Sequence, residues 1–76
     1  MTARDVIRLI ERNGGILLRQ RGSHRQYEAR GTLADGNEIT ARTTVAQHVG
    51  DVRPGTLRAI ERDPEPVFGK GWLKGR

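Results

Sequence analysis

An Asn-Gly-Gly sequence at residues 13–15 separates two parts of the chain whose apolar residues recur with different periods. Before it, apolar residues at positions 6, 7, 9 and 10 follow helical spacing, with charged residues on the opposite side. Thr2 and Asp5 have the spacing of a capping box, and glycine accepts the left-handed conformation in which many helices end. These signals predict a helix over residues 3–13.

Beyond the glycines, the pattern is typical of β-strands over residues 16–20, 23–33 and 38–46, and Asp35-Gly36 indicates a hairpin turn between the last two. A three-residue loop would pair Leu33 with Ile39 and Tyr27 with Val45, which sets apolar residues opposite one another. Because side chains alternate along a strand, this register predicts that Tyr27 faces the core and that His24 faces solvent.

The C-terminal part indicates a second helix that begins near Thr56, the expected N-cap, and ends near residue 63, because Pro64 cannot continue it. The tail over residues 66–76 contains Phe68 and Trp72, so we expect it to fold back onto the body. The prediction is one α+β domain over residues 1–76, in the order α-β-β-β-α. A three-stranded antiparallel sheet with both helices on one face resembles the double-stranded-RNA-binding fold.

Size and charge exclude several classes of protein. A chain of 76 residues without cysteine has no disulfides and no thiolate zinc site, and its core is too thin for a deep substrate cavity. It has neither a signal-like apolar segment near the start nor an apolar run of the ~20 residues that span a bilayer, so we expect a cytoplasmic protein that does not associate with a membrane. Fourteen Lys and Arg against nine Asp and Glu give a net charge of +5, and nearly all the positive residues are Arg, which favours nucleic acid as a partner.

The densest group of reactive residues lies between positions 19 and 25, where a histidine follows a Gly-Ser corner among arginines. RNA cleavage needs a base for the 2′-OH, an acid for the leaving 5′ oxygen and cations for the charge on phosphorus. Histidine suits either proton role, and arginine suits the third. An ordinary surface histidine among solvated arginines is the competing interpretation. The catalytic candidate is His24, and the candidate RNA contacts are Arg19, Arg21, Gly22, Ser23 and Arg25.

His48 is the second histidine, and it precedes Gly50-Asp51. It could supply a second proton-transfer group, although a solvated loop residue is the more common case. His24, His48 and Asp51 do not have the spacing of a metal site. We therefore expect an activity that depends on no metal and no cofactor.

Three stretches give the chain a resemblance to the HicA toxins of the HicAB toxin–antitoxin systems. They are residues 5–14 (DVIRLIERNG), similar to the opening helix of the family, residues 21–27 (RGSHRQY), similar to its Gly-Ser-His motif before an aromatic residue, and residues 54–60 (PGTLRAI), similar to its Pro-Gly-Thr-Leu-Arg-Ser-Ile signature. Each stretch alone is a weak signal, but their order in so short a chain is specific.

The resemblance implies a ribonuclease that cuts messenger RNA, the histidine of the Gly-Ser-His motif (here His24) as its catalytic residue, and a HicB-like antitoxin that covers the active surface. Two other interpretations fit the charge and the fold. One is a non-catalytic RNA-binding module on the same fold, and the other is a protein that acts only by interaction with a partner.

Overall fold

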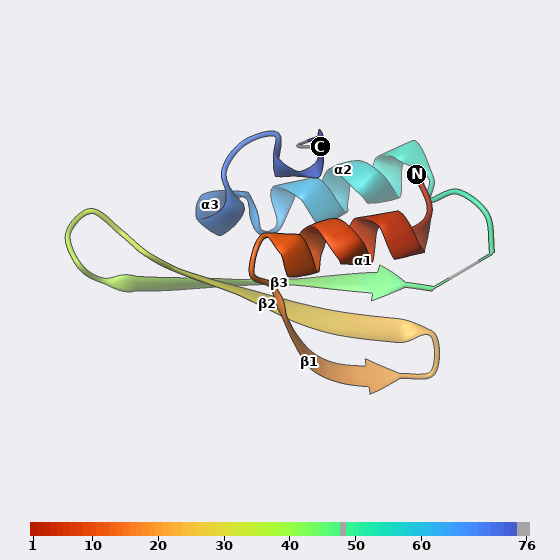
Figure 1. Cartoon of the computed structure of the whole chain (residues 1–76), viewed down its shortest axis with the longest axis horizontal. Coiled ribbons are helices and arrows are strands. Elements are labelled where there is room, and N and C mark those ends of the chain that lie inside the picture. The colour runs from red at the N-terminus through yellow and green to blue at the C-terminus, as the bar shows by residue number, and fades with distance from the viewer. Residues whose placement is uncertain (48, 75–76) are drawn as a thin grey trace.

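The computed structural model describes residues 1–47 and 49–74, and it confirms the predicted α+β class and the α-β-β-β-α order. The helices gather on one face of an antiparallel sheet with the strand order β1-β2-β3 (Figure 1). In the described residues, no helix has the length and apolar character needed to cross a membrane. The elements are α1 (Ala3–Arg12), β1 (Ile16–Arg21), β2 (His24–Thr32), β3 (Glu38–Ala46), α2 (Pro54–Arg62), α3 (Glu65–Phe68) and the 3-10 helix η1 (Trp72–Lys74).

The first helix begins and ends where its sequence signals predict. The Thr2 hydroxyl accepts a hydrogen bond from the Asp5 backbone N–H at 3.2 Å, and the Asp5 carboxylate accepts one from the Thr2 N–H at 3.0 Å. This reciprocal pair satisfies two N–H groups that have no partner within the helix. Asn13 caps the C-terminal end, and Gly14 follows with a φ of 94°.

The predicted register between β2 and β3 is wrong by two residues. Tyr27 pairs with Thr43 and Gly31 pairs with Ile39, so the loop spans residues 33–37 and not the three residues expected. The loop is closed by its own hydrogen bonds: the Leu33 N–H donates to the Asn37 carbonyl at 2.7 Å. Leu33 is left 44% exposed, so the apolar pairing that favoured the shorter loop does not form.

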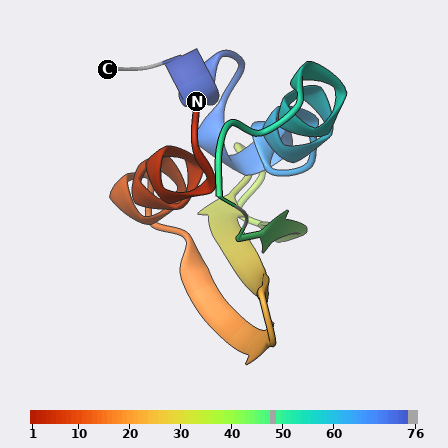
Figure 2. The ribbon, with the colours of Figure 1, turned by 90° about the vertical axis from the view of Figure 1, so that its right-hand side faces the viewer.

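The predicted faces survive this error because a shift of two residues preserves strand alternation. Tyr27 and Ala29 are buried on the helix side of β2, as expected. Gly31 lies on that side too, where a Cβ atom would approach a Val67 Cγ to 3.1 Å, so α3 packs closely over the sheet there. The opposite face of the sheet carries no helix, and β1 extends beyond the helical layer with all its residues exposed (Figure 2).

The N-cap of the second helix lies three residues earlier than predicted. Arg53, and not Thr56, is its N-cap, and no side chain caps it. Pro54 takes the first helical position, where its fixed φ suits a helix and its missing N–H costs nothing. The helix ends at Arg62, close to the predicted end, and Pro64 precedes the short helix α3.

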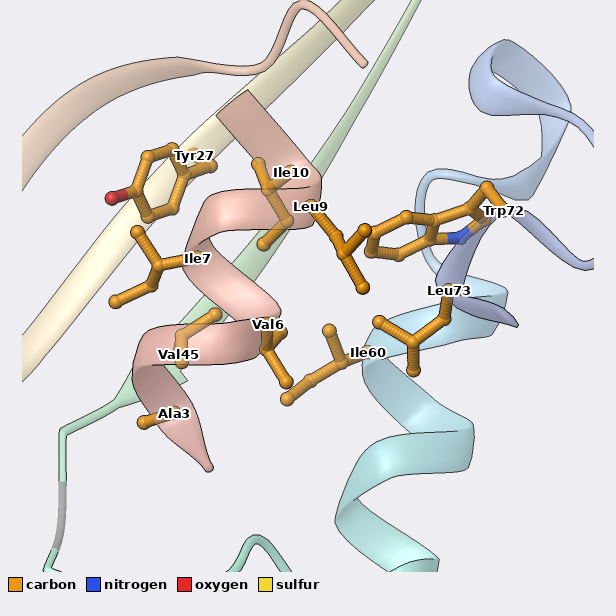
Figure 3. Packing of buried hydrophobic residues seen from close by; sticks show 10 residues of the cluster. All are labelled: Ala3, Val6, Ile7, Leu9, Ile10, Tyr27, Val45, Ile60, Trp72 and Leu73. Carbon is orange, nitrogen blue, oxygen red and sulfur yellow. The ribbon is translucent and has the colours of Figure 1, made fainter. Parts of the chain in front are cut away.

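The core lies between the sheet and the helices, and the C-terminal segment contributes to it. Trp72 and Leu73 are each 5% exposed. The Trp72 indole N–H donates to the Glu61 carbonyl at 2.7 Å, and its ring meets Phe68 edge-on with centroids 5.1 Å apart. The cluster in Figure 3 comprises Ala3, Val6, Ile7, Leu9, Ile10, Tyr27, Val45, Ile60, Trp72 and Leu73.

Candidate active site

The turn between β1 and β2 sets the position of His24. Gly22 has a φ of 54°, a conformation that side chains disfavour, and this lets the chain reverse within the Gly22-Ser23 corner. The Ser23 carbonyl accepts a hydrogen bond from the Gln47 N–H at 2.7 Å, which ties the corner to the end of β3. His24 is therefore the first residue of β2, and it pairs with Arg21 on one side and Ala46 on the other.

His24 lies on the open face of the sheet, in a shallow hollow of about 170 Å³. Arg19 and Arg21 border this hollow from β1, and Gln26 and Thr44 border it from β2 and β3. The hollow brings one exposed imidazole together with two guanidinium groups and two neutral hydrogen-bonding side chains. An anion that enters it meets positive charge next to a group that can transfer protons.

Arg25, a further predicted RNA contact, points to the other face of the sheet. Its Nε donates to the Gln20 side-chain oxygen at 3.2 Å, and a terminal nitrogen donates to the Tyr27 hydroxyl at 3.4 Å. The Gln20 amide nitrogen in turn donates to the Gly22 carbonyl at 3.1 Å. Through Gln20, Arg25 thus supports the turn from the helix-bearing face of the sheet. Arg25 and His24 lie on opposite faces because side chains alternate along a strand.

Two residues of the hollow were absent from the sequence prediction. Gln26 could have been found, since it lies two residues from His24 and therefore on the same face. Thr44 could not, because its position opposite Gln26 depends on the register between β2 and β3. The candidate His48 lies outside the described residues. Within residues 1–47 and 49–74, no three His, Cys, Asp or Glu side chains gather as a metal site would require.

Farther along the same face, Glu28 forms the main ionic cluster of the sheet. Its side chain is only 9% exposed, and its two oxygens accept hydrogen bonds from the Nε atoms of Arg30 and Arg42, the latter at 3.3 Å. The hydrogen bond from Arg30 is the main cause that lowers the pKa of Glu28, and Arg42 adds to it against the opposing effect of burial.

Stability is expected to fall with acid through two carboxylates. The hydrogen bond from the Thr2 backbone lowers the pKa of Asp5, as the arginines lower that of Glu28. A folded-state pKa below the unfolded value contributes stability above the unfolded pKa, and that stability is lost as the pH falls through the folded value. Urea unfolding between about pH 6 and pH 2 should show this loss, with a smaller slope in the Asp5→Asn, Glu28→Gln double variant. Parallel curves for the two proteins would contradict it.

Comparison with known proteins places the chain in a family. The family described as the HicA toxin of bacterial toxin–antitoxin systems matches residues 3–64, a span that includes all three strands and the whole hollow. No curated protein and no solved structure matches the chain. The match covers most of the 76 residues. The chain therefore belongs to the HicA family, the toxins of bacterial toxin–antitoxin systems.

Proposed function

We propose that this toxin is an endoribonuclease that cuts messenger RNA, with His24 as the general acid or base of the reaction. The observation that supports the proposal is the hollow on the open face of the sheet, in which Arg19, Arg21 and His24 meet. A flat, positively charged face suits a flexible polyanion better than a small molecule, because it offers charge without an enclosed pocket. RNA fits such a site for a further reason, since each nucleotide carries its own nucleophile.

The reaction needs little from the protein. The 2′-oxygen of one nucleotide attacks the adjacent phosphorus, the bond from phosphorus to the 5′ oxygen breaks, and a 2′,3′-cyclic phosphate and a 5′-OH result. The 2′-OH loses a proton and the 5′ oxygen gains one, and the imidazole of His24 transfers a proton at one of these two oxygens. The guanidinium groups of Arg19 and Arg21 stabilise the negative charge that builds on the phosphate oxygens. The N–H groups of the Gly22-Ser23 corner are further candidates to bind phosphate.

The same geometry supports a proposal about how the toxin is inhibited. A toxin of this family is paired with an antitoxin, and we propose a HicB-like antitoxin that covers the hollow. His24 and Arg21 are exposed beside the turn between β1 and β2, on the open face of the sheet, so a protein surface can reach them without any rearrangement of the core. The complex would block RNA and neutralise the arginines together. We also propose that the toxin acts in the cytoplasm, where messenger RNA is present.

The experiment is to incubate the purified toxin with a defined RNA and to identify the ends of the fragments. Fragments with 2′,3′-cyclic phosphate and 5′-OH ends support the proposed chemistry. The competing function is a non-catalytic RNA-binding module, which one observation favours: within the described lining of the hollow, His24 is the only histidine, and no carboxylate, cysteine or lysine stands beside it as a second proton-transfer group. Intact RNA that binds the toxin, with an affinity that falls steeply with salt, would select this alternative.

Removal of divalent metal is expected to leave the cleavage rate unchanged. Arg19 and Arg21 supply beside His24 the positive charge for which many nucleases use a metal ion. A short unstructured RNA should be used, because its conformation does not itself depend on magnesium. The rates with EDTA and with added magnesium should agree. A rate that disappears in EDTA and returns with magnesium would contradict a metal-independent mechanism.

A further inference from the structure

The ionic cluster at Glu28 holds more positive charge than its carboxylate needs. One buried carboxylate engages two guanidinium groups, so the cluster keeps a net charge of +1. Arg30 and Arg42 remain 61% and 62% exposed at their side chains. Both guanidinium groups therefore present positive charge to solvent on the open face of the sheet.

The hydrogen bonds leave the binding ends of both arginines available. Each arginine donates to Glu28 through Nε, and within the described residues no hydrogen bond or salt bridge engages the terminal nitrogens of either group. Those nitrogens are the ones that form paired hydrogen bonds with two oxygens of one phosphate. Glu28 holds the guanidinium groups at one place on the sheet, which reduces the entropy lost when they bind.

The cluster lies on the same face as the hollow. Glu28 follows His24 by four residues of β2, a separation of roughly 13 Å along the strand, and Gln26 lies between them on that face. Arg42 lies directly opposite Glu28 on β3. Beyond Arg30, the next charged residue on this face is Glu38, at the end of the hairpin, so the positive track ends there.

We propose that Arg30 and Arg42, held by Glu28, form a second phosphate-binding subsite for the RNA strand that His24 cuts. The subsite binds a backbone phosphate away from the scissile one, and it aligns the strand along β2 across the open face. The inference rests on the proposed ribonuclease function. It adds to that function a direction for the substrate and a minimum length for tight binding.

The test measures binding without cleavage. Fluorescence anisotropy is recorded with 2′-O-methyl RNA, which lacks the 2′-OH nucleophile, as a trinucleotide and as a strand of about twelve nucleotides. The variant that removes the proposed subsite, called the clamp variant, is the double replacement Arg30→Gln, Arg42→Gln. The matched control is Arg58→Gln, Arg62→Gln, which removes the same charge from exposed positions on α2, in the helical layer. Circular dichroism checks that both variants fold.

For the wild-type protein, the longer strand is expected to bind more tightly than the trinucleotide. The clamp variant should lose most of this gain, about tenfold in affinity, and its salt dependence should fall by about 0.7 for each phosphate contact removed. The control should keep the gain. Equal losses in the two variants, or a clamp variant that keeps the gain, would overturn the subsite. Because no cleavage is measured, this result is independent of the proposed ribonuclease activity. The ends of the RNA fragments test that activity separately.

Discussion

Replacement of His24 by alanine is expected to lower the rate of RNA cleavage by about two to four orders of magnitude, the usual contribution of a proton-transfer group. The imidazole is exposed in the hollow, and in the described residues it makes no hydrogen bond that holds the fold. The variant should therefore unfold at the same urea concentration as the wild type. Growth and transcript integrity after induction measure the effect in cells, and single-turnover cleavage of a short RNA measures it in solution.

A second variant separates proton transfer from binding. His24→Gln retains a polar side chain of similar reach that does not titrate near neutral pH, so it should be as inactive as His24→Ala. Both variants should still bind 2′-O-methyl RNA, because Arg19 and Arg21 remain. Arg58→Gln, at an exposed position on α2 in the helical layer, serves as a control. Equal toxicity of the wild type and both His24 variants would exclude catalysis by this residue.

Replacement of Trp72 by alanine is expected to reduce the free energy of unfolding by about 3–5 kcal/mol, the range for loss of a large buried aromatic side chain. The ring is 5% exposed, packs edge-on against Phe68 and bonds the Glu61 carbonyl. A domain of this size is only marginally stable, so a large fraction of the Trp72→Ala molecules should be unfolded. We propose on this basis that the described part of the C-terminal segment, residues 66–74, belongs to the same domain as the rest of the chain.

The measurement is urea unfolding followed by circular dichroism, because Trp72 is the only tryptophan and its fluorescence is lost in the variants. Trp72→Phe is the control. It keeps an aromatic ring in the core but loses the hydrogen bond to Glu61, and it should cost about 1–3 kcal/mol. An unchanged midpoint in Trp72→Ala would mean that the segment around Trp72 adds nothing to the stability of the domain.

The features that the sequence by itself determined are those that depend on neighbours along the chain. The capping box of Thr2 and Asp5 and the glycine after Asn13 determine α1, because each acts within one helical turn. The bounds of β3 and the open-face position of His24 follow from alternation within a strand, and a register error of two residues left that position unchanged. The family resemblance depended on the same kind of local sequence, over three short stretches, and the family match over residues 3–64 agrees with it.

Only the tertiary structure decided which residues meet across strands and layers. Thr44 joins the hollow, and Glu28 meets Arg42, through the register between β2 and β3. That register goes with a five-residue loop closed by its own hydrogen bonds, and it leaves Leu33 without the expected apolar partner. Arg25, one residue from His24, is separated from it by the thickness of the sheet. The physical reason is that helix caps and strand alternation are set by adjacent residues, whereas register and packing depend on contacts between distant segments that form only when the whole chain folds.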